Sequence, residues 1–502
     1  MDLRDYQLDA EDALREAVRA GHRRIIVQMP TGAGKTVFAG HIQMAVAGRG
    51  KRALFAAHRL ELLEQPYKKL VDAGVDESLL SIRGGGERKR RRADAPLQIC
   101  SIGSLKRGDF RGYDVIFIDE AHRAACKSYL DALEDVDPNT IIIGLTATPE
   151  RLDGKGLDTA GFTVIIVAAQ PSLLIERGYI VDPDVYTAPD HLLPDLSNVT
   201  IGEDFAKKST AVAVDRVELI GGIVEHYAKL GQGLPAISFA VNVPHSKNIV
   251  AMFEGVGIRA VHVDGGSRRE IRSGALKDLR EGRVRVVSQC DLWVEGLDEP
   301  ELRVCIDGQP TASLTRHLQK AGRVMRPNRG LPSIILDHAG NTMRHGLPSE
   351  DRTYSLKGRP KGVPRIPSLR RCNKCYLIVK LSATKCHGCG QSLGPEQVVQ
   401  ITYTPQQLAK IDPESFKHAY WNKLWLEAYE MGDNAHGVRR KYEKRFNAPP
   451  QGWDPPRRPP VDRSPQAMAK KREILWMIAK RNELPDQWVR DRLERIYGTN
   501  AA

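Results

Sequence analysis

The segment MPTGAGKT at residues 29–36 constrains the fold of this chain more than any other feature. It follows the apolar run IIVQM directly and precedes the helical pattern VFAGHIQMAV. Glycines let several backbone N–H groups face one anion, and a helix N-terminus favours negative charge. A strand, glycine-rich loop and helix in this order predict a site for nucleotide phosphates. The alternative, a chance glycine-rich turn, does not explain the flanking strand and helix.

Five residues of this loop are the expected nucleotide-binding residues: Thr31, Gly32, Gly34, Lys35 and Thr36. We expect the ammonium group of Lys35 to reach the β and γ phosphates of ATP, and the hydroxyl of Thr36 to bind Mg²⁺.

The motif VIFIDEAH at residues 115–122 adds acidic groups to this site. An apolar strand that ends in acidic residues places carboxylates at the C-terminal edge of a sheet, where phosphate loops also lie. We expect Asp119 to hold Mg²⁺ directly or through water, and Glu120 to polarise the attacking water as general base. We expect His122 to couple this site to a second domain. An acidic pair at a strand end can also be a solvated edge, but the upstream loop favours the catalytic interpretation.

Two series of short apolar runs predict two α/β domains. The first series lies at 25–29, 53–58, 97–102, 115–120 and 141–146, and the second at 236–241, 259–264, 284–289, 302–307 and 333–338. Helical stretches alternate with the runs, which is typical of a parallel sheet buried on both faces. The similar period of the two series indicates two copies of one architecture, joined by a proline-containing connector.

Charge favours a polyanionic partner, with a basic but inert surface as the alternative. The 502 residues include 75 Lys+Arg and 62 Asp+Glu, which gives a net charge of +13. No run of about 18 apolar residues is present, so we expect no membrane span. The N-terminus lacks the apolar core of a signal peptide. Four scattered cysteines are expected to be reduced thiols, which favours a cytoplasmic compartment.

Four further cysteines are clustered as Cys372-Asn-Lys-Cys375 and Cys386-His-Gly-Cys389. Each CxxC pair can form a tight turn that presents two thiolates to one metal ion, so the cluster predicts a small zinc ribbon with structural Zn²⁺. A redox dithiol pair, an iron–sulfur cluster and a degenerate module are the alternatives.

Composition divides the chain into six expected segments. These are a nucleotide-binding lobe at 1–185, a connector at 186–209, a second lobe at 210–345, a basic Pro/Gly-rich linker at 346–371, the cysteine module at 372–392 and a helical basic region at 400–502. In the last segment Trp421, Trp425 and Tyr429 recur at helical spacing, which favours a helix core over a base-stacking platform.

With these motifs in order, residues 1–345 resemble the superfamily-two helicases of the DEAH type, which have two RecA-like lobes. LRDYQ at 3–7 is similar to the element that recognises adenine in that family. The similarity implies that Gln7 reads the edge of the base and that Arg4 stacks on its ring. LTATPER at 145–151 is similar to the motif that links hydrolysis to strand movement through Thr146 and Thr148.

The second half of the chain extends the resemblance. EGLDEP at 295–300 is similar to the fifth motif of the family, which implies nucleotide contacts from Gly296 and Asp298. QKAGRVMRP at 319–327 is similar to the sixth motif. There Gln319 would sense the γ-phosphate, while Arg323 and Arg326 are the arginine-finger candidates that stabilise charge on the transferred phosphoryl group.

The motif order and the C-terminal cysteines are most similar to RadD-like bacterial DNA-repair helicases. UvsW-like phage helicases and restriction-type DNA translocases share the LRxYQ and EGxDxP features, but the sequence has no nuclease or methyltransferase motif that would favour a restriction enzyme. The resemblance implies an ATP-dependent helicase or translocase on DNA, acting in repair, recombination or replication, with ATP, Mg²⁺ and structural Zn²⁺. An RNA helicase is one alternative, and Thr146-Ala147-Thr148 favours DNA over it only weakly. A zinc-containing nucleic-acid-binding protein without ATPase activity is another, but the intact catalytic set argues against it. Protein partners are not predictable from the sequence.

Overall fold

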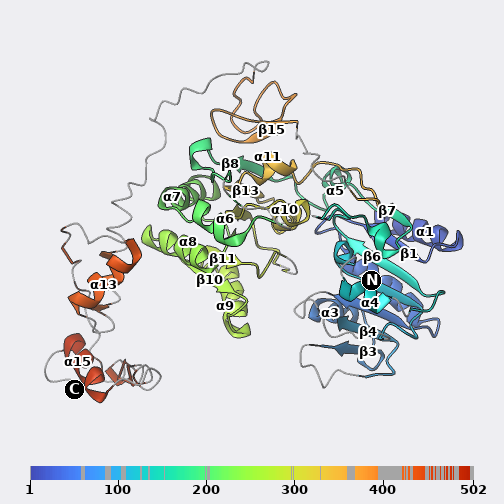
Figure 1. Cartoon of the computed structure of the whole chain (residues 1–502), viewed down its shortest axis with the longest axis horizontal. Helices are drawn as coiled ribbons and strands as arrows, with labels where there is room; N and C mark the ends of the chain where they lie inside the picture. The colour runs from blue at the N-terminus through green and yellow to red at the C-terminus, as the bar shows by residue number, and fades with distance from the viewer. Residues whose placement is uncertain are drawn as a thin grey trace. The chain divides into compact units, whose positions relative to one another are not determined.

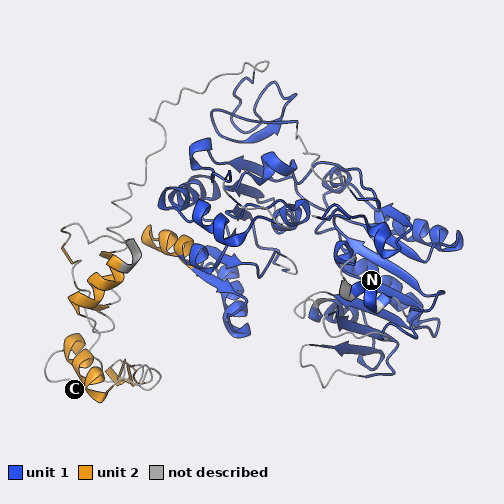
Figure 2. Cartoon of the chain, in the orientation of Figure 1, with its two compact units in different colours: residues 1–247, 261–399 blue, residues 248–260, 400–502 orange. Residues whose placement is uncertain are grey.

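The computed structural model describes residues 2–57, 63–84, 92–102, 109–124, 127–133, 136–151, 153–197, 199, 204–294, 297, 299–327, 330–358 and 368–393, and parts of 421–497. The chain divides into two compact units (Figure 2). One unit comprises residues 1–247 and 261–399, and the other comprises 248–260 and 400–502. In the described part of the chain, every helix is too short or too polar to span a membrane.

The first lobe is built on a seven-stranded sheet in the order β3-β4-β2-β5-β6-β1-β7 (Figure 1). All six pairings are parallel. This confirms the predicted parallel α/β fold of the first half. The strands are β1 Arg24–Gln28, β2 Ala53–Ala57, β3 Leu80–Arg83, β4 Leu97–Ser101, β5 Val115–Ile118, β6 Ile141–Thr146 and β7 Val164–Val167.

Helices bury both faces of this sheet, which explains its continuous apolar strands. Ile25 and Val27 of β1 belong to the cluster that contains Phe38 of α2, whereas Ile26 between them packs with Tyr129 of α4. Successive side chains of a strand point to opposite faces, so each face has its own core. The helices are α1 Asp5–Arg19, α2 Lys35–Ala47, α3 Glu64–Asp72, α4 Lys127–Leu133 and α5 Pro171–Glu176, with short 3₁₀ turns at Glu77–Leu79, Ala121–Arg123 and Leu157–Ala160.

The second lobe is built on a six-stranded sheet in the order β10-β11-β9-β12-β13-β8. The pairings β11–β9, β9–β12, β12–β13 and β13–β8 are parallel, as predicted for the second half. Its strands are β8 Asp184–Thr187, β9 Ala236–Phe239, β10 Ala260–Asp264, β11 Val286–Cys290, β12 Val304–Asp307 and β13 Ile334–Asp337. Its helices are α6 Lys207–Val214, α7 Val217–His226, α8 Val243–Gly255, α9 Arg269–Arg280, α10 Leu314–Ala321 and α11 Asn341–His345, with 3₁₀ and π turns at Asp190–Leu192 and Tyr227–Gly231.

Strand β8 differs from the sequence expectation, which divided its residues between the first lobe and the connector. It pairs with β13 at the edge of the second sheet. The flanking Pro183 and Pro189 favoured a connector, but an edge strand tolerates proline just outside its ends because no ladder hydrogen bond is lost there. We therefore propose that the first lobe ends before Asp184.

The stretch after α11 also departs from a simple linker. Residues 347–358, called here the return segment, lead back to the first lobe. Gln170 Nε2 donates to the carbonyl of Arg352 at 2.8 Å, and the amide of Arg352 donates to Gln170 Oε1 at 3.1 Å. Gly358 forms a β-bridge with Lys155. Residues 359–367 of the expected linker lie outside the described residues, and its last residues, 368–371, belong to a hairpin module instead.

Residues 368–393 form a small hairpin module. Its strands β14 Leu369–Arg371 and β15 Ile378–Lys380 are antiparallel. The module contacts the edge strand β8, because the amide of Thr187 donates to the carbonyl of Tyr376 at 3.2 Å.

The described residues of the C-terminal region are mainly helical, as predicted. They include α13 Ala435–Phe446 and α15 Asp486–Tyr497. Trp421 is only 6% exposed and packs with Tyr442 and Val438, with Trp425 partly buried against them. The structure therefore places these tryptophans in a small helical core.

Candidate functional site

The loop between β1 and α2 has the backbone that the glycine pattern predicts. Gly32 and Gly34 have φ angles of 87° and 79°, a region that side chains disfavour. A Cβ on Gly34 would also lie 2.9 Å from Gln7 Nε2. Helix α2 begins at Lys35, and Thr36 follows in its first turn. The loop and the free amides of this helix end can therefore hold an anion.

Lys35 lies back over its own loop. Its Nζ donates to the carbonyls of Met29 and Pro30 at 3.2 and 3.4 Å. Burial lowers the pKa of Lys35, while the carboxylates of Glu120 and Asp119 oppose that shift. The charge of Arg323, from the second lobe, lowers it further. The predicted phosphate lysine, acidic pair and arginine therefore lie within electrostatic reach of one another.

The acidic pair follows β5 at the carboxyl edge of the first sheet, where the strand order is β5-β6-β1. The amide of Asp119 donates to the carbonyl of Ala56 at 2.9 Å, and the amide of Glu120 donates to Asp119 Oδ1 at 3.0 Å. Glu120 has a φ of 51°, an unfavourable conformation for a non-glycine residue. This sharp turn places both carboxylates at the sheet edge from which the phosphate loop also begins.

A chain of polar contacts runs from the acidic pair to the second lobe. His122 Nδ1 lies 3.4 Å from Glu120 Oε2 and 3.3 Å from Thr146 Oγ1. Thr146 Oγ1 donates to the carbonyl of Thr148 at 2.7 Å. The hydroxyls of Thr148 and Thr315 are 2.5 Å apart. The motif analysis had singled out His122, Thr146 and Thr148 but missed Thr315, whose one signal is its place one helical turn before Gln319.

Helix α10 and the turn after it carry the predicted sixth-motif residues. Gln319 is 1% exposed, and neither polar atom of its amide has a hydrogen-bond partner among the described residues. Arg323 donates to the carbonyls of Leu297 and Val294 at 2.5 and 2.8 Å, and Arg326 donates to Leu297 at 3.2 Å. Both guanidinium groups thus contact the backbone of the predicted fifth motif. Gly296 and Asp298 of that motif lie outside the described residues.

Close packing joins this turn to the phosphate loop. A Cβ on Gly322 would lie 2.4 Å from the Cγ2 atom of Thr31. The turn between Gln319 and Arg323 therefore approaches the phosphate loop directly, with glycine where a larger residue would collide.

Arg4 and Gln7 lie beside the phosphate loop at the start of α1. Gln7 Nε2 donates to the carbonyls of Ala33 and Gly34 at 3.2 and 3.3 Å, and its Oε1 accepts from the amide of Arg4 at 3.0 Å. Tyr6 Oη donates to Ala33 at 2.6 Å, and burial raises the pKa of Tyr6. The start of α1 is therefore fastened to the loop by three side-chain hydrogen bonds.

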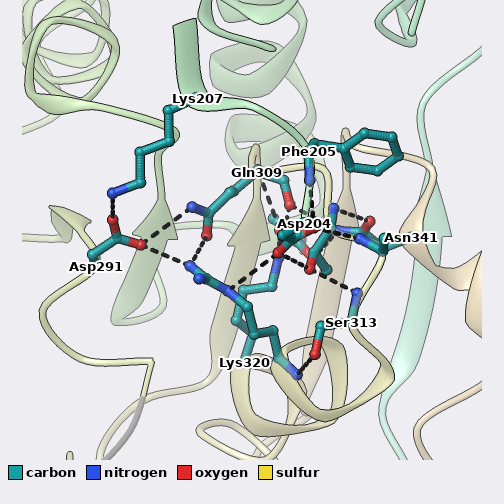
Figure 3. A network of polar contacts seen from close by, with 12 residues as sticks. Asp204, Phe205, Lys207, Asp291, Gln309, Ser313, Lys320 and Asn341 are labelled. Carbon is teal, nitrogen blue, oxygen red and sulfur yellow. Dashed lines mark hydrogen bonds and ion pairs between the residues drawn. The ribbon is translucent and has the colours of Figure 1, made fainter. Parts of the chain in front are cut away.

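A network in the second lobe positions α10 (Figure 3). Asp291, at the end of β11, accepts from Arg316 of α10 at 2.7 Å and pairs with Lys207 of α6. Burial raises the pKa of Asp291, but Lys207 and Arg316 outweigh it and hold that pKa below its usual value. Asp204 accepts from the Thr311 hydroxyl at 2.7 Å, just before α10. No sequence motif marked Asp204 or Lys207, because the contacts join segments far apart in the chain.

A buried ion pair holds the other side of α10. Lys320 Nζ donates to Asp307 Oδ1 at 2.5 Å and to the carbonyl of Gln309 at 2.8 Å, and Asn341 Nδ2 donates to Asp307 Oδ2 at 2.8 Å. The side chains of Lys320 and Asp307 are 1% and 4% exposed. Because an unpaired buried charge is strongly unfavourable, this pair fixes the axial position of α10.

The four clustered cysteines converge. Their sulfur atoms all lie within 4.8 Å of one another, with Cys372–Cys389 at 3.6 Å and Cys375–Cys386 at 3.5 Å. Zinc with four thiolates at about 2.3 Å requires sulfur separations of roughly 3.8 Å. The amide of Tyr376 donates to the carbonyl of Cys372 at 2.9 Å and that of Gly390 to the carbonyl of Cys386 at 2.8 Å, so each pair forms a tight turn. The donor set and its spacing fit one tetrahedral zinc ion.

Two protein-family models match the chain. "Type III restriction enzyme, res subunit" matches residues 1–151, and "Helicase conserved C-terminal domain" matches residues 224–328. The chain belongs to the superfamily-two helicases. Its two helicase domains imply use of ATP and Mg²⁺, and the family consists of ATP-dependent enzymes that act on nucleic acid.

Individual relatives agree with this membership. A "51.5 kDa protein" of a Lactococcus phage is 28% identical over 397 residues, which cover 78% of this helicase chain and 83% of the phage protein. "Putative mitochondrial ATP-dependent helicase irc3" of Schizosaccharomyces pombe is 29% identical over 362 residues, which cover 69% of the chain but only 58% of the yeast protein. A solved fragment of a "putative HsdR subunit of a type I restriction enzyme" from Vibrio vulnificus shares the fold, with a TM-score of 0.52, 19% identity and coverage of 71% of this chain and 67% of that chain.

Proposed function

We propose that this helicase-family protein is a DNA-dependent ATPase that translocates on or unwinds DNA. The observation that carries the proposal is the polar chain from Glu120 through Thr148 to Thr315, which links the acidic pair of one lobe to α10 of the other. An ATPase that only hydrolyses nucleotide has no need of such a path. A motor does, because hydrolysis has to change how its lobes are held.

ATP would bind with its phosphates on the loop formed by Thr31, Gly32 and Gly34. Lys35 would exchange its carbonyl contacts at 3.2 and 3.4 Å for the β and γ phosphates. Arg4 and Gln7, at the start of α1, would contact the adenine.

Mg²⁺ fits the hard oxygen donors of Thr36 and Asp119, which would hold it. When bound, it would neutralise charge on the β and γ phosphates.

Hydrolysis would use groups from both lobes. Glu120 would orient and deprotonate the attacking water. Gln319, whose buried amide has no hydrogen-bond partner among the described residues, would donate from Nε2 to an oxygen of the γ-phosphate. Arg323 and Arg326 would leave the carbonyls of Leu297 and Val294 to stabilise the transferred phosphoryl group. We also propose that Gly296 and Asp298 border the nucleotide.

A DNA track is supported by the net charge of +13 and by the match to a restriction-enzyme family model. On the sequence resemblance to RadD-like and UvsW-like helicases, we propose a role in DNA repair, recombination or replication. Structural Zn²⁺ in the cysteine module would stabilise the hairpin that contacts β8.

The test is ATP hydrolysis by the full-length protein, alone and with single-stranded DNA, duplex DNA, forked DNA and RNA. We expect strong stimulation by DNA, loss of activity in Lys35→Ala and wild-type activity in the surface control Lys51→Ala. Stimulation by RNA alone would refute the DNA track and favour an RNA helicase. No hydrolysis by folded, zinc-loaded protein with any nucleic acid would refute the motor and leave a nucleic-acid-binding protein.

A further inference from the structure

The turn at residues 177–181 borders the phosphate loop but belongs to none of the motifs. It follows α5, and the amides of Gly178 and Tyr179 donate to carbonyls of the last helical turn at 2.9 and 2.8 Å. Gly178 has a φ of 69°. These are the hydrogen bonds of a Schellman helix end, which fixes the residue after the glycine. An ion pair between Arg177 and Asp5 fastens the turn to the start of α1.

The ring of Tyr179 lies beside two residues at the start of α1, Arg4 and Tyr6. The guanidinium carbon of Arg4 lies 4.3 Å from the centroid of this ring. The ring of Tyr6 lies 5.6 Å away at 56° and has its hydroxyl on the carbonyl of Ala33 in the phosphate loop. One face of the Arg4 guanidinium is therefore covered by an aromatic ring that is itself held at the edge of the loop.

We propose that Tyr179 is a positioning residue for the nucleotide base. By stacking on one face of the planar Arg4 guanidinium, it holds this group in one orientation, so that the opposite face can stack on a purine ring. A guanidinium plane can stack on an aromatic ring at each face, and each contact restricts its rotation. The inference rests on the proposed ATP site and adds to it a residue outside the family motifs.

The surroundings of Tyr179 allow the ring to be removed without moving the backbone. The amide of Val181 donates to the carbonyl of Met325 at 2.8 Å, and Ile180 is only 2% exposed. These contacts remain in a Tyr179→Leu variant, as does the helix end before it. A change in nucleotide affinity in that variant therefore reports the loss of the stack.

The experiment compares the binding of ADP and of inorganic tripolyphosphate by calorimetry, with full-length protein and no nucleic acid. Tripolyphosphate has no base, so it reports the phosphate loop alone. The variants are Tyr179→Leu, Tyr179→Phe and the matched control Tyr113→Leu. Tyr113 also stacks with an arginine, Arg52 at 4.9 Å, but precedes β5 and so lies at the opposite edge of the first sheet.

We expect Tyr179→Leu to raise the Kd for ADP about three- to thirty-fold, as loss of a cation–π contact implies, and to leave the Kd for tripolyphosphate within twofold. Tyr179→Phe keeps the ring and is expected to bind ADP like the wild type, and so is Tyr113→Leu. An unchanged Kd for ADP, or equal weakening of both ligands, would overturn the proposal. Because no turnover is measured, a protein that binds ADP but hydrolyses no ATP would refute the motor while still testing Tyr179.

Discussion

The contact between Thr148 and Thr315 gives a quantitative test of coupling between the lobes. Their hydroxyls are 2.5 Å apart, and the residues are 0% and 6% exposed. A neutral hydrogen bond contributes about 1 kcal/mol net, and a buried hydroxyl left without a partner costs about 1–3 kcal/mol. The hydroxyl of Thr315 also lies 3.4 Å from the carbonyl of Glu150, whereas the hydroxyl of Thr148 has no second partner among the described residues. Thr315→Val should therefore be more harmful than Thr148→Val.

If the closed, hydrolytic state needs this hydrogen bond, each substitution that removes it should lower the DNA-stimulated kcat. A barrier raised by about 1–3 kcal/mol slows turnover roughly 5- to 150-fold. The assay is steady-state ATP hydrolysis at saturating DNA for Thr148→Val, Thr315→Val and the double variant. Their interaction energy should be about 0.5–3 kcal/mol, because the second substitution removes a bond already lost.

Thr140→Val is the matched control for this cycle. Thr140 is 4% exposed and donates to the carbonyl of Tyr113 at 2.7 Å, before β6 and away from the second lobe. It should change thermal stability without a comparable effect on kcat. Purely additive effects of Thr148→Val and Thr315→Val on kcat would show that the contact carries no coupling.

Three further predictions concern metal, backbone and pH. Cys375→Ser should reduce bound zinc from one ion per chain towards none by mass spectrometry, while Cys290→Ser should leave it unchanged. Gly358→Ala should accelerate hydrogen exchange of the backbone amides where the return segment contacts the first lobe, because a Cβ at residue 358 would lie 2.4 Å from a backbone oxygen. Gly330→Ala is the control, because Gly330 has the same φ of 73° but open surroundings. Burial lowers the pKa of His226 from 6.5 to about 4. The neutral buried imidazole therefore contributes up to about 3 kcal/mol to the free energy of unfolding above pH 6.5, and this contribution is lost as the pH falls towards 4. His226→Gln should make the denaturation midpoint fall less steeply between these pH values. Equal slopes of midpoint against pH in the variant and the wild type would refute this assignment.

Much of the geometry of the proposed ATP site could be predicted because its determinants are local in sequence. A glycine pattern between one strand and one helix fixes the loop around Lys35, and a strand followed directly by two acids fixes Asp119 and Glu120. Parallel strands bring their carboxyl ends to one edge, so two local motifs meet without further information. The continuous apolar runs reflect the same regularity, since strands covered on both faces need no polar positions.

The features that the sequence did not predict depend on contacts between distant segments. Tyr179 follows a short helix with no distinctive pattern, and only the fold brings it to Arg4. Strand β8 was obscured by its flanking prolines, whose effect depends on whether the strand is central or at an edge. Asp204 and Lys207 are ordinary charged residues until the second sheet places Thr311 and Asp291 beside them.

The return segment connects the two lobes a second time, because it is covalently joined to the second lobe and held to the first by hydrogen bonds and a β-bridge. The first runs from α5 into β8, and the second runs back from α11 through Asp351 and Arg352. The two connections are joined to each other at the start of α5. There the amide and the hydroxyl of Ser172 both donate to the carboxylate of Asp351, at 3.0 and 2.6 Å. Two connections that lie side by side act mechanically as one hinge, which permits rotation about the line through them and resists sliding and twisting. We therefore expect relative motion of the lobes to be mainly a rotation about this pair of connections, with the cysteine module keeping its contact between Tyr376 and Thr187 of the second lobe.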